Sequence, residues 1–249
     1  MRTQIKTADE VAAMRRGGKV LAQTLQILKE ASKPGMPTRE YDRLARAELT
    51  KHGMQAAFLG YQGFPAAICV SVNHEIAHGI PNDYIIQDGD LVHLDFGVTC
   101  EGMITDAGIA FVVGKATEEQ QRLIKGTKKA LDAGIAKVKD GVRVGDIGAA
   151  IESTLEAYQL AVVYELGGHG VGHNVHEDPY IANFGTAGTG EALRSGMTVA
   201  IEPNVCLVGH EMYLEDNGWT WSTKSGALAA QFEHTVLVTD TGCEILTQV

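Results

Sequence analysis

Residues 89–106, GDLVHLDFGVTCEGMITD, hold two apolar runs that are typical of β-strands, and each run carries one carboxylate. We expect strands over Leu91–Gly97 and Met103–Val113, because both runs are rich in Val, Ile and Phe. Asp95 and Asp106 lie inside them, eleven residues apart. Aspartate is depleted in strands and is almost never fully buried unless it is paired. One such residue would normally lie on the outward face of a strand, so the pair needs support from elsewhere in the chain.

The same pattern returns in the second half of the chain. Gly89–Asp95 aligns with Gly196–Glu202 at an offset of 107 residues. A second carboxylate follows in each half, Asp106 and then Glu233, at an offset of 127, so the second half has 20 additional residues between its carboxylates. We expect further strands over Ala66–Val72, Met197–Leu207 and His234–Thr239.

A pair of predicted helices precedes the strands of each half. Thr7 with Glu10, and Thr117 with Gln120, are capping-box starts 110 residues apart. The apolar spacing predicts two helices between Thr7 and Gly53, separated at Lys33-Pro34-Gly35, and two between Thr117 and Tyr158, separated at Asp140-Gly141. The third helix is expected to include Val138.

These repeated patterns indicate a duplicated, pseudo-twofold α/β (α+β) architecture, with a site where the halves meet. Chance similarity is the alternative, and the matching carboxylates disfavour it. We expect one catalytic domain over residues 1–249, with halves of roughly 1–114 and 115–249.

Composition narrows the class of protein further. A net charge of -10 disfavours nucleic acid as the main ligand, because phosphate binding needs a basic face. The four dispersed cysteines suit reduced thiols better than a disulfide framework. There is no secretory signal and no apolar run near the ~20 residues that cross a bilayer, so we expect a cytoplasmic protein without a membrane segment.

Four carboxylates gathered in one interior need a counter-charge. Residues 52–114 contain no Lys or Arg, so a divalent metal is the obvious compensation. Three histidines could complete the site: His169 within GGHGVG, residues 167–172, together with His78 and His176. Each alone is more often a loop residue than a ligand, so the combination carries the argument. An oxygen-rich set disfavours structural zinc and suits a pair of Mn, Fe or Co ions, and Zn also fits.

Several longer motifs resemble those of the methionine aminopeptidases, and the resemblance covers almost the whole chain. They are LGYQGFP at 59–65, CVSVN at 69–73, HGIP at 78–81, GHGVG at 168–172, IEP at 201–203 and QFEHT at 231–235. The resemblance implies the pita-bread fold, in which helix pairs and an antiparallel sheet surround a central dimetal site. It also implies a function, which is removal of the initiator methionine from nascent proteins when the second residue is small.

Carried over by motif, the resemblance assigns a role to each acidic residue. Asp95 corresponds to a ligand of one metal ion, His169 and Glu202 to ligands of the other, and Asp106 and Glu233 to bridging ligands. Glu202 would also be the general base. His78 and His176 would hydrogen-bond the substrate and steady the tetrahedral intermediate.

The resemblance also implies a methionine pocket. Its lining would be Phe58, Tyr61, Phe64, Cys69, His78 and Trp219. Ordinary core packing is the alternative for any one of these side chains. The sequence departs from the common pattern at Phe58, Ala77 and Val175, which puts the fine selectivity of the pocket in doubt but not the reaction.

The spacing and length suggest a short bacterial type I enzyme. Glu202 follows His169 by only 33 positions, which leaves no room for the type II insertion. The expected partners are the amino-terminal methionine of nascent chains and, through them, transient contact with the ribosome; the resemblance suggests a monomer. Two other functions are open: a proline-specific aminopeptidase or dipeptidase, and a non-catalytic binding protein on the same fold.

Overall fold

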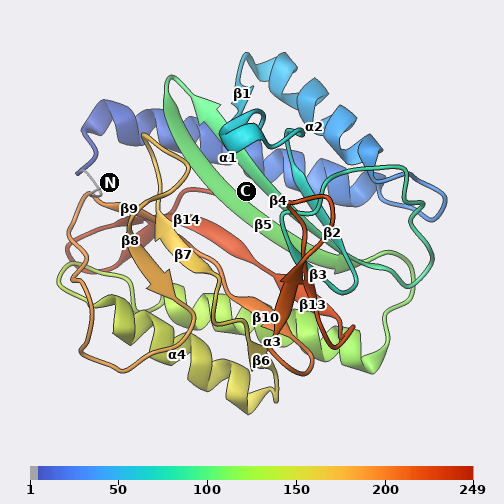
Figure 1. Cartoon of the computed structure of the whole chain (residues 1–249). Helices are drawn as coiled ribbons and strands as arrows, with labels where there is room; N and C mark the ends of the chain where they lie inside the picture. The colour runs from blue at the N-terminus through green and yellow to red at the C-terminus, as the bar shows by residue number, and fades with distance from the viewer. Residues whose placement is uncertain (1–4, 249) are drawn as a thin grey trace.

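Four helices form the outer layer of the molecule, and their starts follow the capping signals of the sequence (Figure 1). The structure, a computed structural model, describes residues 5–248. The helices are α1 Ala8–Ala31, α2 Arg39–His52, α3 Glu118–Ile135 and α4 Val144–Ala157. Both predicted capping boxes are confirmed: the Thr7 hydroxyl accepts from Glu10 N while Glu10 accepts from Thr7 N, and Thr117 and Gln120 repeat the arrangement.

The third helix ends earlier than predicted. Val138 lies beyond α3, because the chain tightens into shorter-range hydrogen bonds, from Lys137 N to Gly134 O and from Val138 N to Ile135 O. Such bonds are a common way to satisfy the last carbonyls of a helix. Val138 is still buried in the core beside α3. Its apolar side chain therefore reflects burial, and not membership of the helix.

One antiparallel sheet of nine strands crosses both halves of the chain. Its order is β1-β4-β5-β14-β9-β7-β8, with β2 added to β4 and β15 to β14. The strands are β1 Gln55–Ala56, β2 Cys69–Val72, β4 Leu91–Cys100, β5 Met103–Val112, β7 Gly167–Gly170, β8 Glu177–Ala182, β9 Thr198–Ile201, β14 Glu233–Val238 and β15 Cys243–Ile245. The pairing of β5 with β14 joins the two sets of strands that the sequence pattern predicted.

The predicted strand Met197–Leu207 is in fact two strands. It breaks at Glu202-Pro203, and β10 Asn204–Cys206 leaves the main sheet to pair with β13 Ala229–Gln231 and β6 Ala161–Val162. Proline has no N–H to give to a strand ladder, which explains the break. A third small sheet contains β11 Met212–Leu214, β12 Trp221–Thr223 and β3 Glu75–Ala77, and a 3-10 turn η1 spans Tyr61–Gly63.

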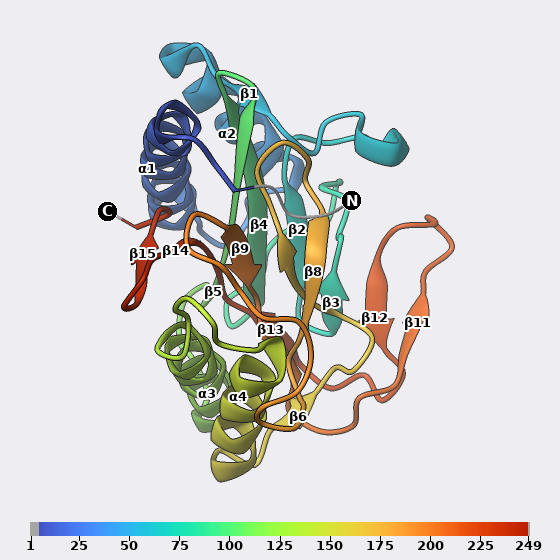
Figure 2. The ribbon, with the colours of Figure 1, turned by 90° about the vertical axis from the view of Figure 1, so that its left-hand side faces the viewer.

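The helices cover one face of the main sheet and leave the other face free to carry polar groups. Figure 2 shows α1, α3 and α4 on one side of the strands and the β11–β12 hairpin on the other. Leu94 and Phe96 of β4 are fully buried in a core cluster with α1 and α2. Burial of each such side chain stabilises the fold by about 1.5–3 kcal/mol. Because strand side chains alternate between faces, Asp95 between them points away from the helices.

Within residues 5–248, every helix is too short or too polar to span a lipid bilayer.

Candidate metal centre

Strand register brings three carboxylates together on the face of the sheet that the helices leave free. Asp95 on β4 lies opposite Gly108 on β5, and Gly108 in turn lies opposite Glu233 on β14. Asp106 is two residues before Gly108, so it shares the same face. All three carboxylates are buried, with Asp95 8% exposed, Asp106 3% and Glu233 2%.

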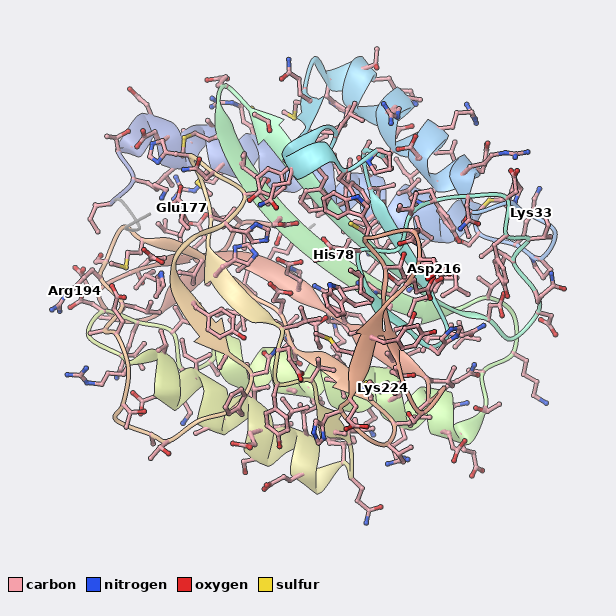
Figure 3. The ribbon with its side chains drawn as sticks, in the orientation of Figure 1. Lys33, His78, Glu177, Arg194, Asp216 and Lys224 are labelled. Atoms are coloured by element: carbon pink, nitrogen blue, oxygen red, sulfur yellow. The ribbon has the colours of Figure 1, made fainter. Side chains whose placement is uncertain are left out.

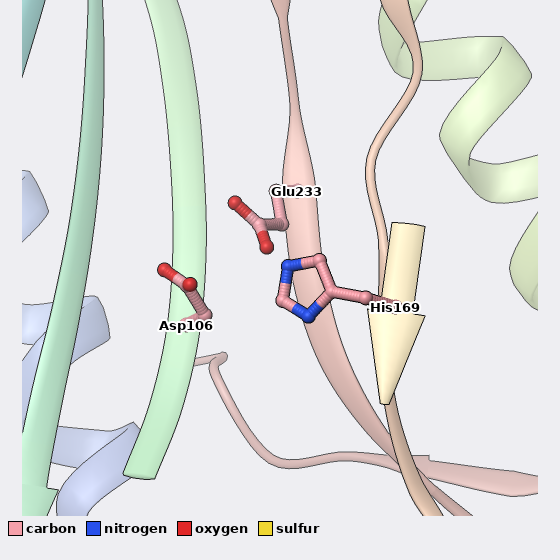
Figure 4. Close-up of side chains that lie close together, drawn as sticks. All are labelled: Asp106, His169 and Glu233. Carbon is pink, nitrogen blue, oxygen red and sulfur yellow. The ribbon is translucent and has the colours of Figure 1, made fainter. Parts of the chain in front are cut away.

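His169 completes this group from β7, which lies on the far side of β14 and β9 in the sheet. Figure 4 shows the side chains of Asp106, His169 and Glu233 pointing toward one another from β5, β7 and β14. One potential ligand atom from each of the three lies within 4.8 Å of the others. The His169 Nδ1 lies 2.9 Å from the carbonyl of Gly170. A carbonyl can only accept, so Nδ1 carries the proton and Nε2 presents a lone pair to the centre.

Glu202 faces that lone pair. Its Oε1 lies 3.3 Å from His169 Nε2, while its Oε2 accepts hydrogen bonds from Gln231 Nε2 at 3.0 Å and Asn204 Nδ2 at 3.1 Å. The two amides fix one oxygen and leave the other aimed at the imidazole. Two electron-pair donors at this separation attract only if a proton or a cation lies between them.

Burial and mutual repulsion disturb the ionisation of the cluster. Burial first, and then the charge of Glu202, raises the pKa of Asp95 to about 7. Burial and the neighbouring carboxylates also raise the pKa of Asp106 and of Glu233 well above the usual range. Burial lowers the pKa of His169, but its hydrogen bond to Glu202 and the charge of that residue outweigh burial and raise it overall. Without a cation, the site therefore takes up protons.

The donor set fits divalent cations. Three buried carboxylate oxygens, Asp95 Oδ1, Asp106 Oδ1 and Glu233 Oε1, have no hydrogen-bond partner among the described residues. Buried polar atoms are normally satisfied, and the lining of the cavity contains no lysine or arginine that could serve. Oxygen donors with one imidazole suit ions such as Mn, Fe, Co or Zn.

The cluster lies in the wall of a cavity of about 120 Å³, and aromatic and apolar side chains together with two histidines form most of the remaining wall. Every predicted site residue lines this cavity, including Phe58, Tyr61, Phe64, Cys69 and Trp219, and Gln62 and Val175 line it as well. Phe64 and Trp219 meet edge to face with ring centroids 5.1 Å apart. Burial raises the pKa of Cys69 well above its usual range, so this thiol is a neutral wall group rather than a nucleophile.

Two further histidines approach the carboxylates across the cavity. His78, labelled near the middle of Figure 3, takes the left-handed φ of 57°, and burial lowers its pKa. His176 Nδ1 lies 3.0 Å from the Tyr61 hydroxyl, and its ring centroid lies 4.4 Å from that of His169. Burial, and then the neighbouring His169, lowers the pKa of His176 to about 3. Both imidazoles are therefore neutral at neutral pH and are suited to hydrogen bonding.

Sequence reasoning missed the contribution of Gln231 and Asn204. The Gln231 amide donates to Glu202 and also lies 3.3 Å from Glu233 Oε2, so it links two of the carboxylates. Gln231 is only two residues before Glu233 in QFEHT, but it lies on β13 and Glu233 on β14, so strand alternation could not predict their common direction. Asn204 had no signal either, because the break at Pro203 hides its direction.

Comparison with known proteins agrees with this geometry. Residues 12–240 match the model of metallopeptidase family M24. The chain is 42% identical over 245 residues to the methionine aminopeptidase of Clostridium perfringens, covering 98% of each chain. The crystal structure of methionine aminopeptidase from Rickettsia prowazekii matches with a TM-score of 0.96 at 39% identity, covering 98% of this chain and 99% of that one.

The chain also has a more distant structural likeness to a prolidase. The prolidase of Pyrococcus furiosus matches with a TM-score of 0.80 at 21% identity, and the alignment covers 65% of that chain. This shows a shared fold only. The predicted resemblance and the pita-bread fold are confirmed by the full-length matches, and the family match makes metal ions part of the site. The chain therefore belongs to metallopeptidase family M24, within its methionine aminopeptidase group of bacterial length.

Proposed function

We propose that the protein hydrolyses the first peptide bond of nascent chains, releasing the initiator methionine when the second residue is small. The observation that carries this proposal is a buried acidic cluster with orphaned oxygens, set directly against a small apolar cavity. The relatives described above support the same reaction by name. A cavity of about 120 Å³ at the hydrolytic centre suits one side chain at the end of a peptide, rather than the middle of a chain.

Two divalent ions, of Co, Mn, Fe or Zn, would be held by the acidic cluster. Asp95 would bind one ion, His169 and Glu202 the other, and Asp106 and Glu233 would bridge them. When bound, such ions lower the pKa of water and polarise a peptide carbonyl. The same centre would hold the free amino group of the substrate, which favours an aminopeptidase over an endopeptidase.

Glu202 would be the proton carrier of the reaction. Its Oε2 is fixed by the amides of Gln231 and Asn204, so its Oε1 stays aimed at the centre. From there the carboxylate takes a proton from the attacking water and passes it to the leaving amine. His78 and His176, both neutral, would donate hydrogen bonds to the substrate carbonyl as negative charge develops on its oxygen.

The apolar wall would select methionine. Phe58, Tyr61, Phe64, Cys69 and Trp219 bury a thioether side chain, for which their soft and apolar surfaces are suited. A pocket of this kind separates methionine from a side chain one methylene shorter by only about 1–3 kcal/mol. Val175, which belongs to the same apolar cluster as Phe58, also shapes this wall.

We also propose the setting of this activity. Residues 1–249 would form one catalytic unit of two related halves, roughly 1–114 and 115–249, acting as a monomer. Its substrate would place it in the cytoplasm, in transient contact with ribosomes where nascent amino termini emerge.

A substrate comparison tests the proposal. Metal-stripped protein is titrated with Mn, Fe, Co and Zn, and its cleavage of Met-Ala-Ser is compared with that of Ala-Pro-Ala. We expect metal-dependent release of methionine from the first peptide and little cleavage of the second. A preference for Ala-Pro-Ala would instead indicate a proline-specific enzyme, and stoichiometric metal binding without cleavage of either peptide would indicate a binding protein.

His176→Ala provides a separate test of the assigned roles. We expect kcat to fall by about 100-fold, because one hydrogen bond to the developing oxyanion is lost. Bound metal, measured by elemental analysis, should stay at the wild-type level, since the side chain is not among the proposed ligands. Loss of metal from this variant would show that His176 is itself a ligand.

A further inference from the structure

The loop between β7 and β8 carries two residues of the cavity wall. Val175 and His176 line the cavity, and β8 begins at the next residue, Glu177. His176 has little freedom to be misplaced if it is to reach the substrate carbonyl, because a shift of about 1 Å in a reacting group can cost 100-fold in rate. The contacts that fix this loop therefore bear on catalysis.

A buried ion pair ties the end of this loop to the amino-terminal segment of the chain. Lys6 Nζ donates to Glu177 Oε2 at 2.9 Å, and the two side chains are 0% and 2% exposed. Figure 3 shows Glu177 beside the start of α1. The Lys6 backbone is itself anchored, because its N–H donates to the carbonyl of Gly196 at 2.9 Å. The backbone that carries the ammonium group is thus fixed by a bond to another part of the fold.

The second oxygen of Glu177 closes the loop on itself. Glu177 Oε1 accepts the backbone N–H groups of His173 at 2.7 Å and Asn174 at 3.0 Å. At Gly172 the loop passes directly over the lysine, since a Cβ added there would lie 2.3 Å from Lys6 Cε. One carboxylate therefore joins the lysine, the start of the loop and the residue that follows His176.

A weaker contact repeats the connection. His173 Nε2 lies 2.7 Å from Glu10 Oε1, the residue that closes the capping box of α1. The side chains of His173 and Glu10 are 31% and 28% exposed, so this pair adds little to the free energy of folding. It nevertheless joins the same two segments.

The burial of the Lys6–Glu177 pair argues for positioning rather than stability. Replacing a buried ion pair with apolar groups is often neutral or stabilising, because desolvation offsets the attraction. What this buried pair does, with three hydrogen bonds to the Glu177 carboxylate, is hold one geometry. We propose that Lys6 and Glu177 are positioning residues that hold His176, and through it the substrate carbonyl, in the reactive arrangement. The proposal rests on the role of His176 proposed above.

The test removes both charges at once. Lys6→Met with Glu177→Gln conserves volume, removes both charges of the pair and keeps an oxygen for the N–H groups of His173 and Asn174. With Met-Ala-Ser as substrate, we expect kcat to fall by at least ~10-fold. KM should stay within about threefold, because the methionine pocket, which binds the substrate and the transition state equally, is unchanged. Metal content should match the wild type.

A double-mutant cycle separates positioning from general damage. If the pair acts through His176, neutralising it in a His176→Ala background should cause no further loss of kcat. An equal loss in both backgrounds, or an unchanged kcat in the charge-neutral variant, overturns the proposal. If that variant fails to fold, Glu177→Asp, which keeps the charge but shortens its reach by one methylene, enters the same cycle with the same expectation.

A matched control and the wild type complete the design. Arg15→Met with Glu244→Gln removes another ion pair of α1, 2.7 Å long but 50% and 40% exposed, which joins the helix to β15 rather than to the loop. Its kcat should equal that of the wild type. Inability of the wild type to cleave Met-Ala-Ser would defeat the proposed function itself, whereas an active wild type with an unaffected neutral pair would defeat only this inference.

Discussion

Asp106→Ala is expected to abolish turnover while the protein stays folded. Asp106 faces His169 and Glu233 with one oxygen unsatisfied, and in our proposal it is a bridging ligand. Loss of a group that merely supports a ligand already costs 10- to 100-fold in metal affinity or activity, so loss of a bridging ligand should exceed about 100-fold. Cleavage of Met-Ala-Ser and bound metal are measured together, and both should fall.

The same variant has a signature in stability that distinguishes it from ordinary damage. Burial, and then repulsion from Asp95 and Glu202, raises the pKa of Asp106. Removing this carboxylate therefore relieves strain in the metal-free protein, whose Tm at pH 8 should stay equal or rise. Asp132→Ala, at an exposed helix position, is the control and should change neither activity nor Tm response to metal. Full activity in Asp106→Ala would contradict the assignment of the centre.

The fold was predictable from the sequence where local signals and periodicity agreed. Both capping boxes, the four helices and the long strands β4, β5 and β14 follow from residue pattern alone, because caps and apolar alternation act over a few residues. The short strands β3, β6, β11 and β12 did not, since two or three residues carry no readable period. Their pairing is decided by partners distant in the chain.

The candidate site was predictable for a different reason. Four carboxylates within apolar sequence conflict with local preference, and such conflicts mark functional sites. The strand register that places Asp95 beside Glu233 across Gly108 cannot be read from sequence. Equally hidden was the Lys6–Glu177 pair, because its members are 171 residues apart and each looks like an ordinary surface charge. The sequence pattern therefore identifies the carboxylates that conflict with their apolar surroundings. Only the tertiary structure shows which side chains they meet.

Removal of metal is expected to abolish activity and to make the protein less stable as pH rises. A carboxyl group whose folded pKa is raised binds its proton more tightly in the folded state, so its stabilising effect is lost as pH rises through the folded pKa. For Asp95 that pKa is about 7, and those of Asp106 and Glu233 are also raised. The raised pKa of His169 acts in the same direction.

Buried histidines oppose this trend only in acid. The pKa of His93 and of His234 is lowered to about 4, and that of His176 to about 3, in each case mainly by burial. Their stabilising effect is lost as pH falls below the unfolded value of about 6.5. Above that pH they are neutral in both the folded and the unfolded state. Between pH 6.5 and 8.5 the acidic cluster therefore ionises without interference from these histidines. Glu75, outside the cluster, also ionises there because burial raises its pKa to about 7, so the comparison with Asp106→Ala identifies the contribution of the cluster.

Thermal unfolding across this window gives the measurement. In EDTA, Tm should fall steadily from pH 6.5 to 8.5, by an amount equivalent to a few kcal/mol of unfolding free energy. With saturating Mn or Co, Tm should be higher, and the gap between the two curves should widen with pH, because ligands must lose their protons to bind a cation. In Asp106→Ala the gap should shrink. A metal-free Tm that is constant or rises over this range would mean that the four acidic residues do not repel one another, and the need for a cation would disappear with that repulsion.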